Sequence, residues 1–320
     1  MSARQVVLVG YDGCELVDVA CVTSALDMAN RLGADPPYRV RLASSAGAQV
    51  RTDSGLLLGS QVALPAVADV DTLIVSGGLR HRAVAGDGEL VRQLRRIAGR
   101  ARRVASVCTG ATLLAEAGLL DGRRATTHWL YAAELAASYP SVRVDASPVF
   151  VRDGPVATSG GVTASLDLTL AFIEEDHGAE LARWVAMGMV TYLQRPGNQA
   201  QMSMFIRAKH PDDATVRAVV DHVLAHPEAD LTTAALAARA GVSARQLTRL
   251  FREHLGDPPG VAVRRMRLEI AARLITSTEL PLSHIARRCG FSSAETLRQA
   301  FTTAFGVSPR TFRETQARTP

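Results

Sequence analysis

An imperfect internal repeat near the C-terminus constrains the fold of this chain more than any other feature. Residues 236–243 (LAARAGVS) recur as residues 285–292 (IARRCGFS). Matching residues follow each copy, namely Phe251, Gly256 and Pro259 after the first and Phe301, Gly306 and Pro309 after the second. In each copy, a small alanine lets two helices approach, glycine takes the positive φ of a tight turn, and serine caps the next helix. The repeat predicts two helix-turn-helix units, over 233–255 and 282–305, that read two successive segments of a DNA major groove.

The distribution of charge favours the same interpretation. The 320 residues have a formal net charge of +5. Residues 1–200 carry 19 basic and 20 acidic side chains, whereas residues 201–320 carry 17 basic and 11 acidic ones. The positive excess therefore lies with the repeat, as expected of a surface that binds nucleic acid. Charge alone leaves open a solvated basic face without a partner.

Cysteine usage and hydropathy exclude several classes of protein. The four cysteines show no paired spacing, so we expect neither disulfides nor a metal site, and no cofactor is implied. We expect no N-terminal leader, because the chain enters an apolar strand pattern at residue 5. We see no apolar run of the length that a bilayer requires. A cytoplasmic protein of two domains is the expectation.

The first two-thirds of the chain alternate short β-rich runs with helical stretches. Strands are predicted over 5–10, 38–44, 72–75 and 103–107, and helices over 17–32 and 88–100. This alternation predicts a parallel, doubly wound α/β sheet with helices on both faces. In such sheets, ligands bind beyond the carboxyl ends of the strands.

Cys108 lies at one of these strand ends. The segment VASVCTGATLLA (104–115) is typical of a strand, a sharp turn and a helix, which is the layout of a nucleophile elbow. The helix N-terminus would favour the thiolate, and backbone N–H groups of Thr109 and of the Gly77-Gly78 turn would cradle an oxyanion or carboxylate. The alternative is that Cys108 is a small buried hydrophobe, as most free cysteines are.

The residues around this turn resemble a known superfamily. Cys108-Thr-Gly and the block AGLLDGRRATTHW (117–129), with Leu16-Val-Asp18, are similar to the PfpI-like branch of the class I glutamine amidotransferase fold. The resemblance implies that Cys108 is the elbow residue and that Asp18 is its acidic neighbour. Isonitrile hydratases carry a similar block, which implies a thiol-dependent hydratase or amidase as an alternative function.

The catalytic set is nevertheless incomplete. The protease-like relatives carry histidine directly after the cysteine, where this chain has Thr109, and the amidotransferases need a late His-x-Glu, whereas His177 is followed by Gly-Ala. His128 either lines the pocket or is a structural histidine in a turn. No base for Cys108 is evident, and thiol catalysis usually needs one. Cys108 and Asp18 are therefore candidates only, and we place a ligand-binding site at Asp18, Gly77, Gly78, Cys108, Thr109 and His128.

The second half of the chain is predicted to be helical from residue 214 onward. We place a sensing and dimerisation domain at 1–205 and a DNA-binding domain at 212–320. Thr233 is expected to cap the first helix of unit one, and Ser243 the second. A long helix over 260–277 connects the two units.

This half resembles the AraC/XylS family of transcription regulators, most specifically in IARRCGFS (285–292) with the later FGVSP (305–309). The resemblance implies that the second helix of each unit enters the major groove. The DNA-binding residues predicted on this basis are Arg245, Thr248, Arg249 and Arg252 in unit one, and Ala294, Glu295, Arg298 and Gln299 in unit two. Arginine suits guanine, Gln299 suits adenine and Glu295 suits cytosine, and contacts to phosphate are the alternative.

Together, the two halves resemble the GlxA-type regulators, which join an amidotransferase-like sensor to an AraC-type DNA-binding domain. The predicted function is a sequence-specific transcription regulator modulated by a small nitrogenous metabolite that binds near Cys108. The expected partners are double-stranded promoter DNA, RNA polymerase, the small-molecule effector and a second copy of the chain in a homodimer. We expect no association with a membrane.

Overall fold

The structure is a computed structural model and describes residues 2–191, 197, 201, 213–305 and 307–317. Contacts within the chain divide it into two compact units, Met1–Gln201 and Met202–Pro320. The boundary predicted between residues 205 and 212 falls outside the described residues, so it stays a prediction. A hydrophobic core fills each unit.

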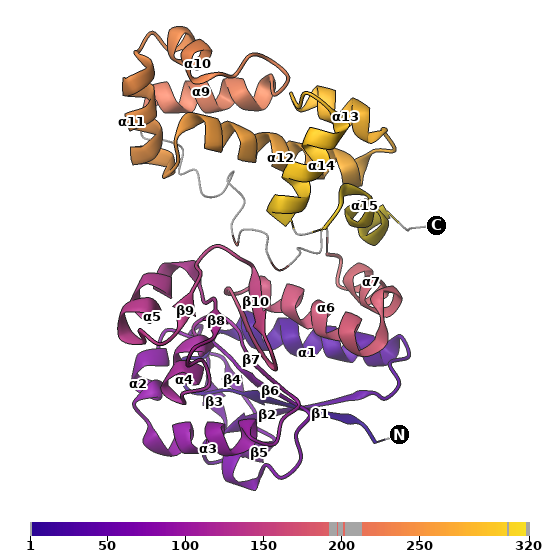
Figure 1. Cartoon of the computed structure of the whole chain (residues 1–320). Coiled ribbons are helices and arrows are strands. Elements are labelled where there is room, and N and C mark those ends of the chain that lie inside the picture. Colours follow the sequence, from indigo (N-terminus) through magenta and orange to yellow (C-terminus); the bar gives the residue numbers. More distant parts are fainter. Residues whose placement is uncertain (1, 192–196, 198–200, 202–212, 306, 318–320) are drawn as a thin grey trace. The chain divides into compact units, whose positions relative to one another are not determined.

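A mixed sheet forms the centre of the first unit (Figure 1). Among the described residues it has seven strands, in the order β10-β11-β7-β6-β1-β2-β5. Neighbouring strands run parallel except for β10 and β11, which are antiparallel. The bounds are β1 Arg4–Val9, β2 Tyr38–Ser44, β5 Val62–Ala63, β6 Thr72–Val75, β7 Arg103–Ser106, β10 Phe150–Asp153 and β11 Val156–Ser159.

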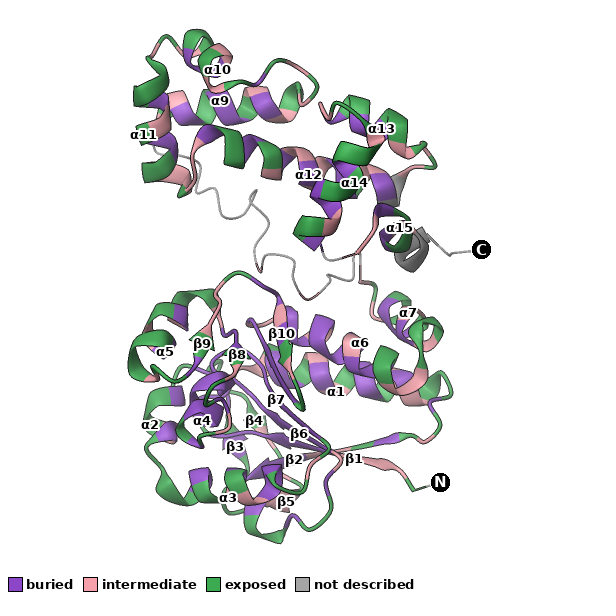
Figure 2. Ribbon diagram, viewed as in Figure 1, coloured by how far each residue is buried: buried purple, intermediate pink, exposed green. Residues whose placement is uncertain are grey.

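Helices cover both faces of this sheet (Figure 1). α1, α6 and α7 pack against one another on one face, and α2, α3 and α4 pack against one another on the other. Their bounds are α1 Leu16–Arg31, α2 His81–Ala85, α3 Gly88–Ala98, α4 Gly110–Glu116, α6 Ala164–His177 and α7 Ala179–Gly188. Figure 2 shows strands that are buried almost throughout and helices that bury one side. The predicted doubly wound α/β fold is confirmed.

Shorter elements complete the first unit. β3 and β4 form a hairpin, and β8 pairs in parallel with β9. The bounds are β3 Val50–Arg51, β4 Leu57–Leu58, β8 Arg124–Ala125, β9 Arg143–Val144, the 3₁₀ turns η1 Leu64–Ala66 and η2 Trp129–Tyr131, and α5 Ala132–Ser138.

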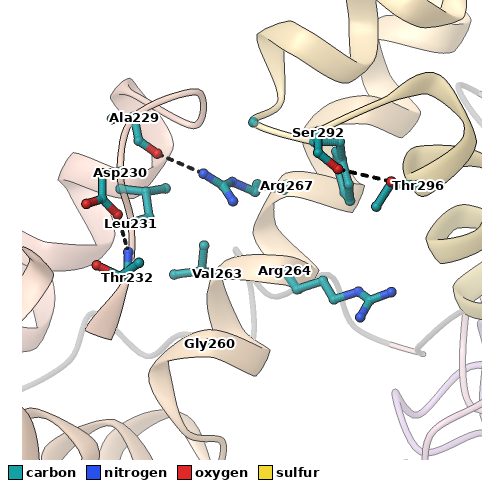
Figure 3. A pocket seen from close by; sticks show the side chains of 12 residues that line it. Ala229, Asp230, Leu231, Thr232, Gly260, Val263, Arg264, Arg267, Ser292 and Thr296 are labelled. Atoms are coloured by element: carbon teal, nitrogen blue, oxygen red, sulfur yellow. Dashed lines mark hydrogen bonds between the residues drawn. The ribbon is translucent and has the colours of Figure 1, made fainter. Parts of the chain in front are cut away.

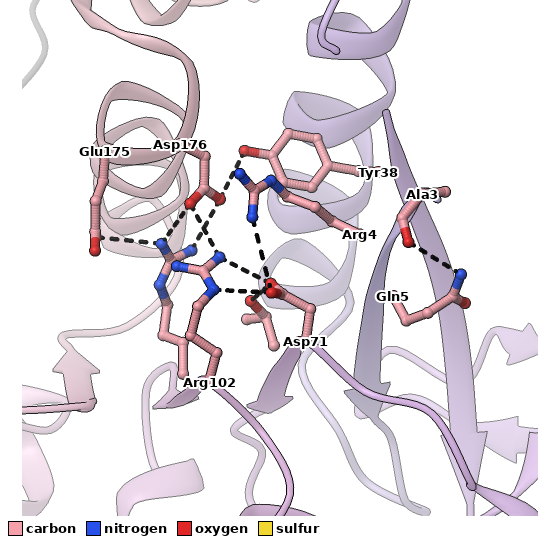
Figure 4. Close-up of polar contacts among 10 residues, drawn as sticks. Ala3, Arg4, Gln5, Tyr38, Asp71, Arg102, Glu175 and Asp176 are labelled. Carbon is pink, nitrogen blue, oxygen red and sulfur yellow. Dashed lines mark hydrogen bonds and ion pairs between the residues drawn. The ribbon is translucent and has the colours of Figure 1, made fainter. Parts of the chain in front are cut away.

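A cluster of ion pairs lies at the amino ends of the strands (Figure 4). The Arg102 guanidinium contacts the carboxylates of Asp71 and Asp176 at 2.8 and 3.0 Å. Arg103 contacts Asp176 at 2.9 Å, and the Tyr38 hydroxyl donates to the same carboxylate at 3.0 Å. Asp176 belongs to α6, so the cluster fastens that helix to the sheet. It lies at the edge opposite to the one where ligands bind in such folds, and we assign it to structure.

The second unit is helical in its described part. Its bounds are α9 Ala214–Ala225, α10 Thr233–Arg239, α11 Ala244–Leu255, α12 Pro259–Ser277, α13 Leu282–Arg288, α14 Ala294–Phe305 and α15 Pro309–Ala317. The pairs α10–α11 and α13–α14 occupy the two predicted helix-turn-helix segments. α12 joins them and, at 1.5 Å per residue, is about 28 Å long.

Local sequence explains where these helices begin and turn. Ser243 caps α11 as predicted, because its hydroxyl accepts from the N–H of Gln246 at 3.2 Å. The prediction of Thr233 as the cap of α10 is wrong. Thr232 is the cap, and its hydroxyl accepts from the N–H of Ala235 at 3.3 Å, whereas Thr233 is the first helical residue. Either of the two adjacent threonines fits the sequence pattern of an N-cap, and only the backbone conformation shows which one is the cap.

Candidate ligand site and DNA-binding helices

Cys108 occupies a sharp turn between β7 and α4. Its φ of 53° lies in the left-handed region, which residues with side chains rarely adopt. The Cys108 N–H donates to the carbonyl of Gly160 at 3.1 Å, and the Cys108 carbonyl accepts from the hydroxyl of Thr127 at 2.9 Å. A side-chain carbon on Gly110 would lie 2.3 Å from the carbonyl oxygen of Val75, so α4 starts directly against β6. The turn thus has the strand-turn-helix geometry of the predicted elbow.

Asp18 is fully buried in the first turn of α1. Its Oδ2 accepts from the N–H of Gly77 at 3.1 Å, and its Oδ1 accepts from the N–H of Val162 at 2.9 Å. Burial raises the pKa of the carboxyl from 3.8 to about 7, although both backbone hydrogen bonds oppose the shift. Asp18 therefore links the turn after β6 to the segment before α6, and the two turns enclose Cys108 between them.

Two glycines allow this close packing around Cys108. A side-chain carbon on Gly77 would lie 2.4 Å from Cβ of Cys108 and 2.9 Å from Oδ2 of Asp18. A side-chain carbon on Gly161 would lie 2.9 Å from Sγ of Cys108 and 2.3 Å from Cδ2 of His128. The sulfur is thus packed between two backbone segments, and Cys108 is only 7% exposed.

The backbone N–H groups of Gly77 and Gly78, which we expected to cradle an oxyanion or carboxylate, already have acceptors within the protein. The Gly77 N–H donates to Asp18, and the Gly78 N–H donates to Oγ1 of Thr109 at 2.8 Å. The Thr109 hydroxyl in turn donates to the carbonyl of Gly78 at 2.9 Å. Both N–H groups are therefore satisfied within the protein, and an incoming anion would have to displace a partner.

Burial opposes the thiolate that the sequence led us to expect at Cys108. Burial raises the pKa of this thiol well above its ordinary value, and the nearby Asp18 carboxyl raises it further. Hydrogen bonding from the Thr109 backbone lowers the pKa by less. α4 begins beside the sulfur, so the field of the helix N-terminus favours the thiolate while desolvation opposes it.

His128 combines a structural contact with a position beside the sulfur. Its Nδ1 accepts from the backbone N–H of Leu130 at 3.3 Å, which caps η2. The ring packs against the rings of Trp129 and Tyr131, with centroids 5.6 and 5.8 Å apart. Burial lowers the pKa of the imidazole, which favours the neutral form. His128 therefore packs against Gly161, which also contacts the Cys108 sulfur, and its Nδ1 is engaged in capping η2.

Sequence reasoning missed three buried hydroxyl groups at the same edge of the sheet. Tyr11, Ser76 and Ser106 lie at the carboxyl ends of β1, β6 and β7, and their side-chain oxygens make no hydrogen bond of ordinary geometry among the described residues, although Thr109 lies near the Tyr11 hydroxyl and Cys14 lies near Ser76. Tyr11 is 5% exposed, and Ser76 and Ser106 are fully buried. Buried hydroxyls are normally paired, so these three groups are candidates for contacts with a small molecule. The strand-end positions of the serines were readable from the sequence, but their lack of ordinary hydrogen bonds was not.

α11 presents an amphipathic surface in the second unit. Its buried face is formed by Leu247, Leu250 and Phe251. The predicted DNA-contacting arginines Arg245, Arg249 and Arg252 are exposed, and Thr248 is partly buried. The Thr248 hydroxyl donates to the carbonyl of Ala244 at 2.8 Å, and Arg249 pairs with Glu253 at 3.3 Å on the surface. Exposed pairs of this kind are weak, so Arg249 can exchange its partner for DNA.

α14 differs from α11 in how its polar face is used. Glu295 accepts from Nη2 of Arg298 at 2.6 Å and from the side-chain amide of Gln299 at 2.9 Å. Ala294 begins this helix and is partly buried. The three polar side chains therefore bind one another, and Glu295 and Gln299 would have to rearrange in order to contact base edges.

Two other features are absent from the described part of the chain. Over the described ranges, no group of three or more potential metal ligands is found. No helix among the described residues is both long and apolar enough to cross a bilayer.

Comparisons with known proteins agree with this geometry. Residues 4–175 match the DJ-1/PfpI family, and residues 236–315 match a helix-turn-helix domain. The chain is 35% identical over 298 residues to the HTH-type transcriptional regulator CdhR of Pseudomonas aeruginosa, covering 93% of this chain and 88% of that protein. It is 33% identical over 302 residues to the HTH-type transcriptional regulator GlxA of Rhizobium meliloti, covering 93% and 92%.

A solved structure shares the fold of the first unit. The crystal structure of a ThiJ/PfpI family protein from Pseudomonas syringae superposes with a TM-score of 0.55 and 25% identity, covering 70% of this chain and 87% of that one. The fold and the two matched domains thus define a DNA-binding transcription regulator with a DJ-1/PfpI domain and an AraC-type helix-turn-helix domain. The chain belongs to the family of HTH-type transcriptional regulators that includes CdhR and GlxA.

Proposed function

We propose that the first unit is a sensor that binds a small nitrogenous metabolite at the carboxyl edge of the sheet and thereby alters DNA binding by the second unit. The observation that carries the proposal is the group of buried hydroxyls of Tyr11, Ser76 and Ser106, which make no hydrogen bond of ordinary geometry among the described residues and lie at the strand ends of the edge that also carries Cys108. A ligand with donors and acceptors would satisfy them. Such a ligand can shift the equilibrium between two conformations of the protein only if its affinities for the two conformations differ.

The chemistry of the site favours binding over catalysis. Cys108 is a thiol of raised pKa, both oxygens of Asp18 accept backbone hydrogen bonds, and His128 is engaged as a cap. A nucleophilic cysteine normally needs a base within hydrogen-bond reach. The relatives that match along both units are named as regulators, which also favours a sensor over a hydratase or amidase.

The second unit supplies the contacts to DNA in this proposal. Residues of α11 and α14 enter successive major-groove segments of a promoter: Arg245, Thr248, Arg249, Arg252, Ala294, Glu295, Arg298 and Gln299. A homodimer would place two such pairs of helices on repeated sites, and RNA polymerase is the partner through which a regulator bound there acts. Promoter DNA in bacteria lies in the cytoplasm, which is where the proposal places the protein.

Ligand binding can be tested on the full chain, because both tryptophans, Trp129 and Trp184, belong to the first unit. Thermal unfolding followed by tryptophan fluorescence would be measured against a panel of amino acids and quaternary amines. A compound that raises the melting temperature of the wild type and of Cys108→Ser, without being consumed, supports a sensor. Tyr11→Phe, which removes one of the three hydroxyls, should weaken that shift.

Two outcomes would contradict the proposal. A compound that the wild type consumes and Cys108→Ser does not would make the protein an enzyme with a DNA-binding domain. A stabilising compound that leaves the affinity for the protein's own upstream DNA unchanged, in fluorescence anisotropy at physiological salt, would separate ligand binding from regulation.

A further inference from the structure

The two helix-turn-helix units face each other across a hollow of about 510 Å³ (Figure 3). Residues 229–232, between α9 and α10, line one side, and residues 290–292, between α13 and α14, line the other. The first half of α12 forms the floor, with Val263, Arg264 and Arg267. The hollow therefore lies between the helix-turn-helix unit that contains α11 and the one that contains α14.

The hydrophobic packing of the two helix-turn-helix units divides along α12. The core cluster that contains residues of α9, α10 and α11 ends on α12 at Met266. Further along the same helix, Ala271 and Ile275 are buried outside that cluster, where α12 contacts α13, α14 and α15. Arg267 lies directly after Met266, at the point where one core ends and the other begins. A single helix without further support would let the two helix-turn-helix units bend relative to each other.

The Arg267 side chain spans from α12 to the loop between α9 and α10, on the α11 side of the hollow (Figure 3). Its Nε donates to the carbonyl of Pro227 at 2.8 Å, and its Nη2 donates to the carbonyl of Ala229 at 2.9 Å. Arg267 is only partly exposed. The guanidinium is planar and rigid, so two hydrogen bonds to carbonyls of one loop fix its orientation.

The turn between α13 and α14 packs against this same guanidinium. Gly290 has a φ of 71°, and a side-chain carbon there would lie 2.3 Å from the carbonyl oxygen of Pro227 and 2.5 Å from Nη2 of Arg267. The equivalent glycine of the first repeat, Gly241, has a φ of 68° but no atom within 4 Å of such a carbon. Both glycines serve a tight turn, and only Gly290 is also needed for a close contact between the two helix-turn-helix units.

We propose that Arg267 and Gly290 form a brace that fixes the separation of α11 and α14, and so determines the spacing of the two DNA segments that the protein accepts. Arg267 is a positioning residue in this proposal and contacts no base. The inference rests on the proposed binding of both helices to DNA. When two linked elements bind together, a fixed geometry raises the effective concentration of the second and restricts binding to sites of matching spacing.

The test is selection of binding sites from a library of randomised duplexes by the full-length protein. We expect the wild type to select two motifs at one spacing. Arg267→Met should select the same two motifs at several spacings, and its affinity for the wild-type optimal site should fall by about tenfold or more. Its affinity for a duplex with one motif should stay within about twofold. Arg267→Lys keeps the charge but offers one donor nitrogen in place of the two that bind the loop, and it should give an intermediate spread of spacings.

Gly290→Ala provides a second route to the same result, with Gly241→Ala as its matched control. Both changes strain a residue of positive φ, but only Gly290→Ala disturbs the contact with Arg267, so only it should broaden the spacing. If Arg267→Met and Gly290→Ala both keep the single wild-type spacing, the brace is disproved while two-helix binding stands. If the wild type itself selects only one motif, two-helix binding fails and the brace fails with it.

Discussion

Oδ1 of Asp18 accepts a hydrogen bond of 2.9 Å from the backbone N–H of Val162, a residue 144 positions later in the chain. Val162 has a φ of 57°, an unusual conformation for a β-branched residue. The strained backbone of one segment is thus held by a buried carboxyl from another. Strain of this kind persists when surrounding contacts determine it, and it concentrates at functional sites.

The protonation of Asp18 should make the stability of the first unit depend on pH. The folded pKa of about 7 lies above the ordinary 3.8, so the folded state binds the proton more tightly than the unfolded state. Stability from this group is fully present below pH 4 and is lost as the pH rises toward 7. The slope for one proton is roughly 1.4 kcal/mol per pH unit. Urea unfolding followed by tryptophan fluorescence should show that Asp18→Asn removes this slope.

The control for that measurement is Asp27→Asn. Asp27 is an exposed acid on the same helix, where it pairs with Arg31 at 2.9 Å. Its removal should leave the pH dependence between 4 and 7 as in the wild type. An Asp18→Asn protein with an unchanged slope would show that the carboxyl is ionised throughout that range.

Cys108 should alkylate slowly at neutral pH. Because burial raises the pKa of its thiol, iodoacetamide should modify it with a midpoint above the value of about 8.5 that is ordinary for cysteine. The check is mass spectrometry of the Cys108 peptide after timed alkylation at several pH values, with glutathione as the reference thiol. Rapid alkylation of Cys108 at pH 7 would contradict the buried thiol and revive the enzyme alternative.

The sequence predicted the elbow at Cys108 but not the groups that hold it. The strand-turn-helix pattern is local and contains small residues, so its backbone course could be inferred. The hydrogen bonds of Asp18 join segments that are far apart in the chain, and no local pattern reports them. The left-handed φ of Val162 could not be inferred either, because valine rarely adopts it. Desolvation of the Cys108 sulfur likewise depends on packing by Gly161, which only the folded structure reveals.

Gly161→Ala should destabilise the first unit. The new carbon would lie 2.3 Å from Cδ2 of His128 and 2.9 Å from Sγ of Cys108, so the ring and the sulfur must both move. Overpacking of this kind costs typically about 1–3 kcal/mol. Gly59→Ala is the matched control, because a carbon there has no neighbour within 4 Å. Equal unfolding midpoints in urea for the two variants would show that the site around Cys108 is loosely packed.

The DNA-binding half was predicted more fully, because a helix-turn-helix unit is specified by local signals. The turn glycines Gly241 and Gly290 both have positive φ, as the repeat required. The repeat could not show that the two glycines differ in their surroundings. Nor could it show that Glu295 holds Arg298 and Gln299 in the unbound protein, since helical spacing permits such contacts without requiring them.

The two recognition helices should therefore contribute unequally to DNA binding. Arg245 is exposed on α11 and has no partner among the described residues, whereas Arg298 on α14 donates two hydrogen bonds to Glu295. We expect Arg245→Ala to weaken binding by about 1–3 kcal/mol if it contacts a base, or to reduce the salt slope by about one unit if it contacts phosphate. Arg298→Ala should cost less, because the wild type must first break the Glu295 pair. Fluorescence anisotropy at several salt concentrations would measure both, and a larger loss for Arg298→Ala would contradict this order.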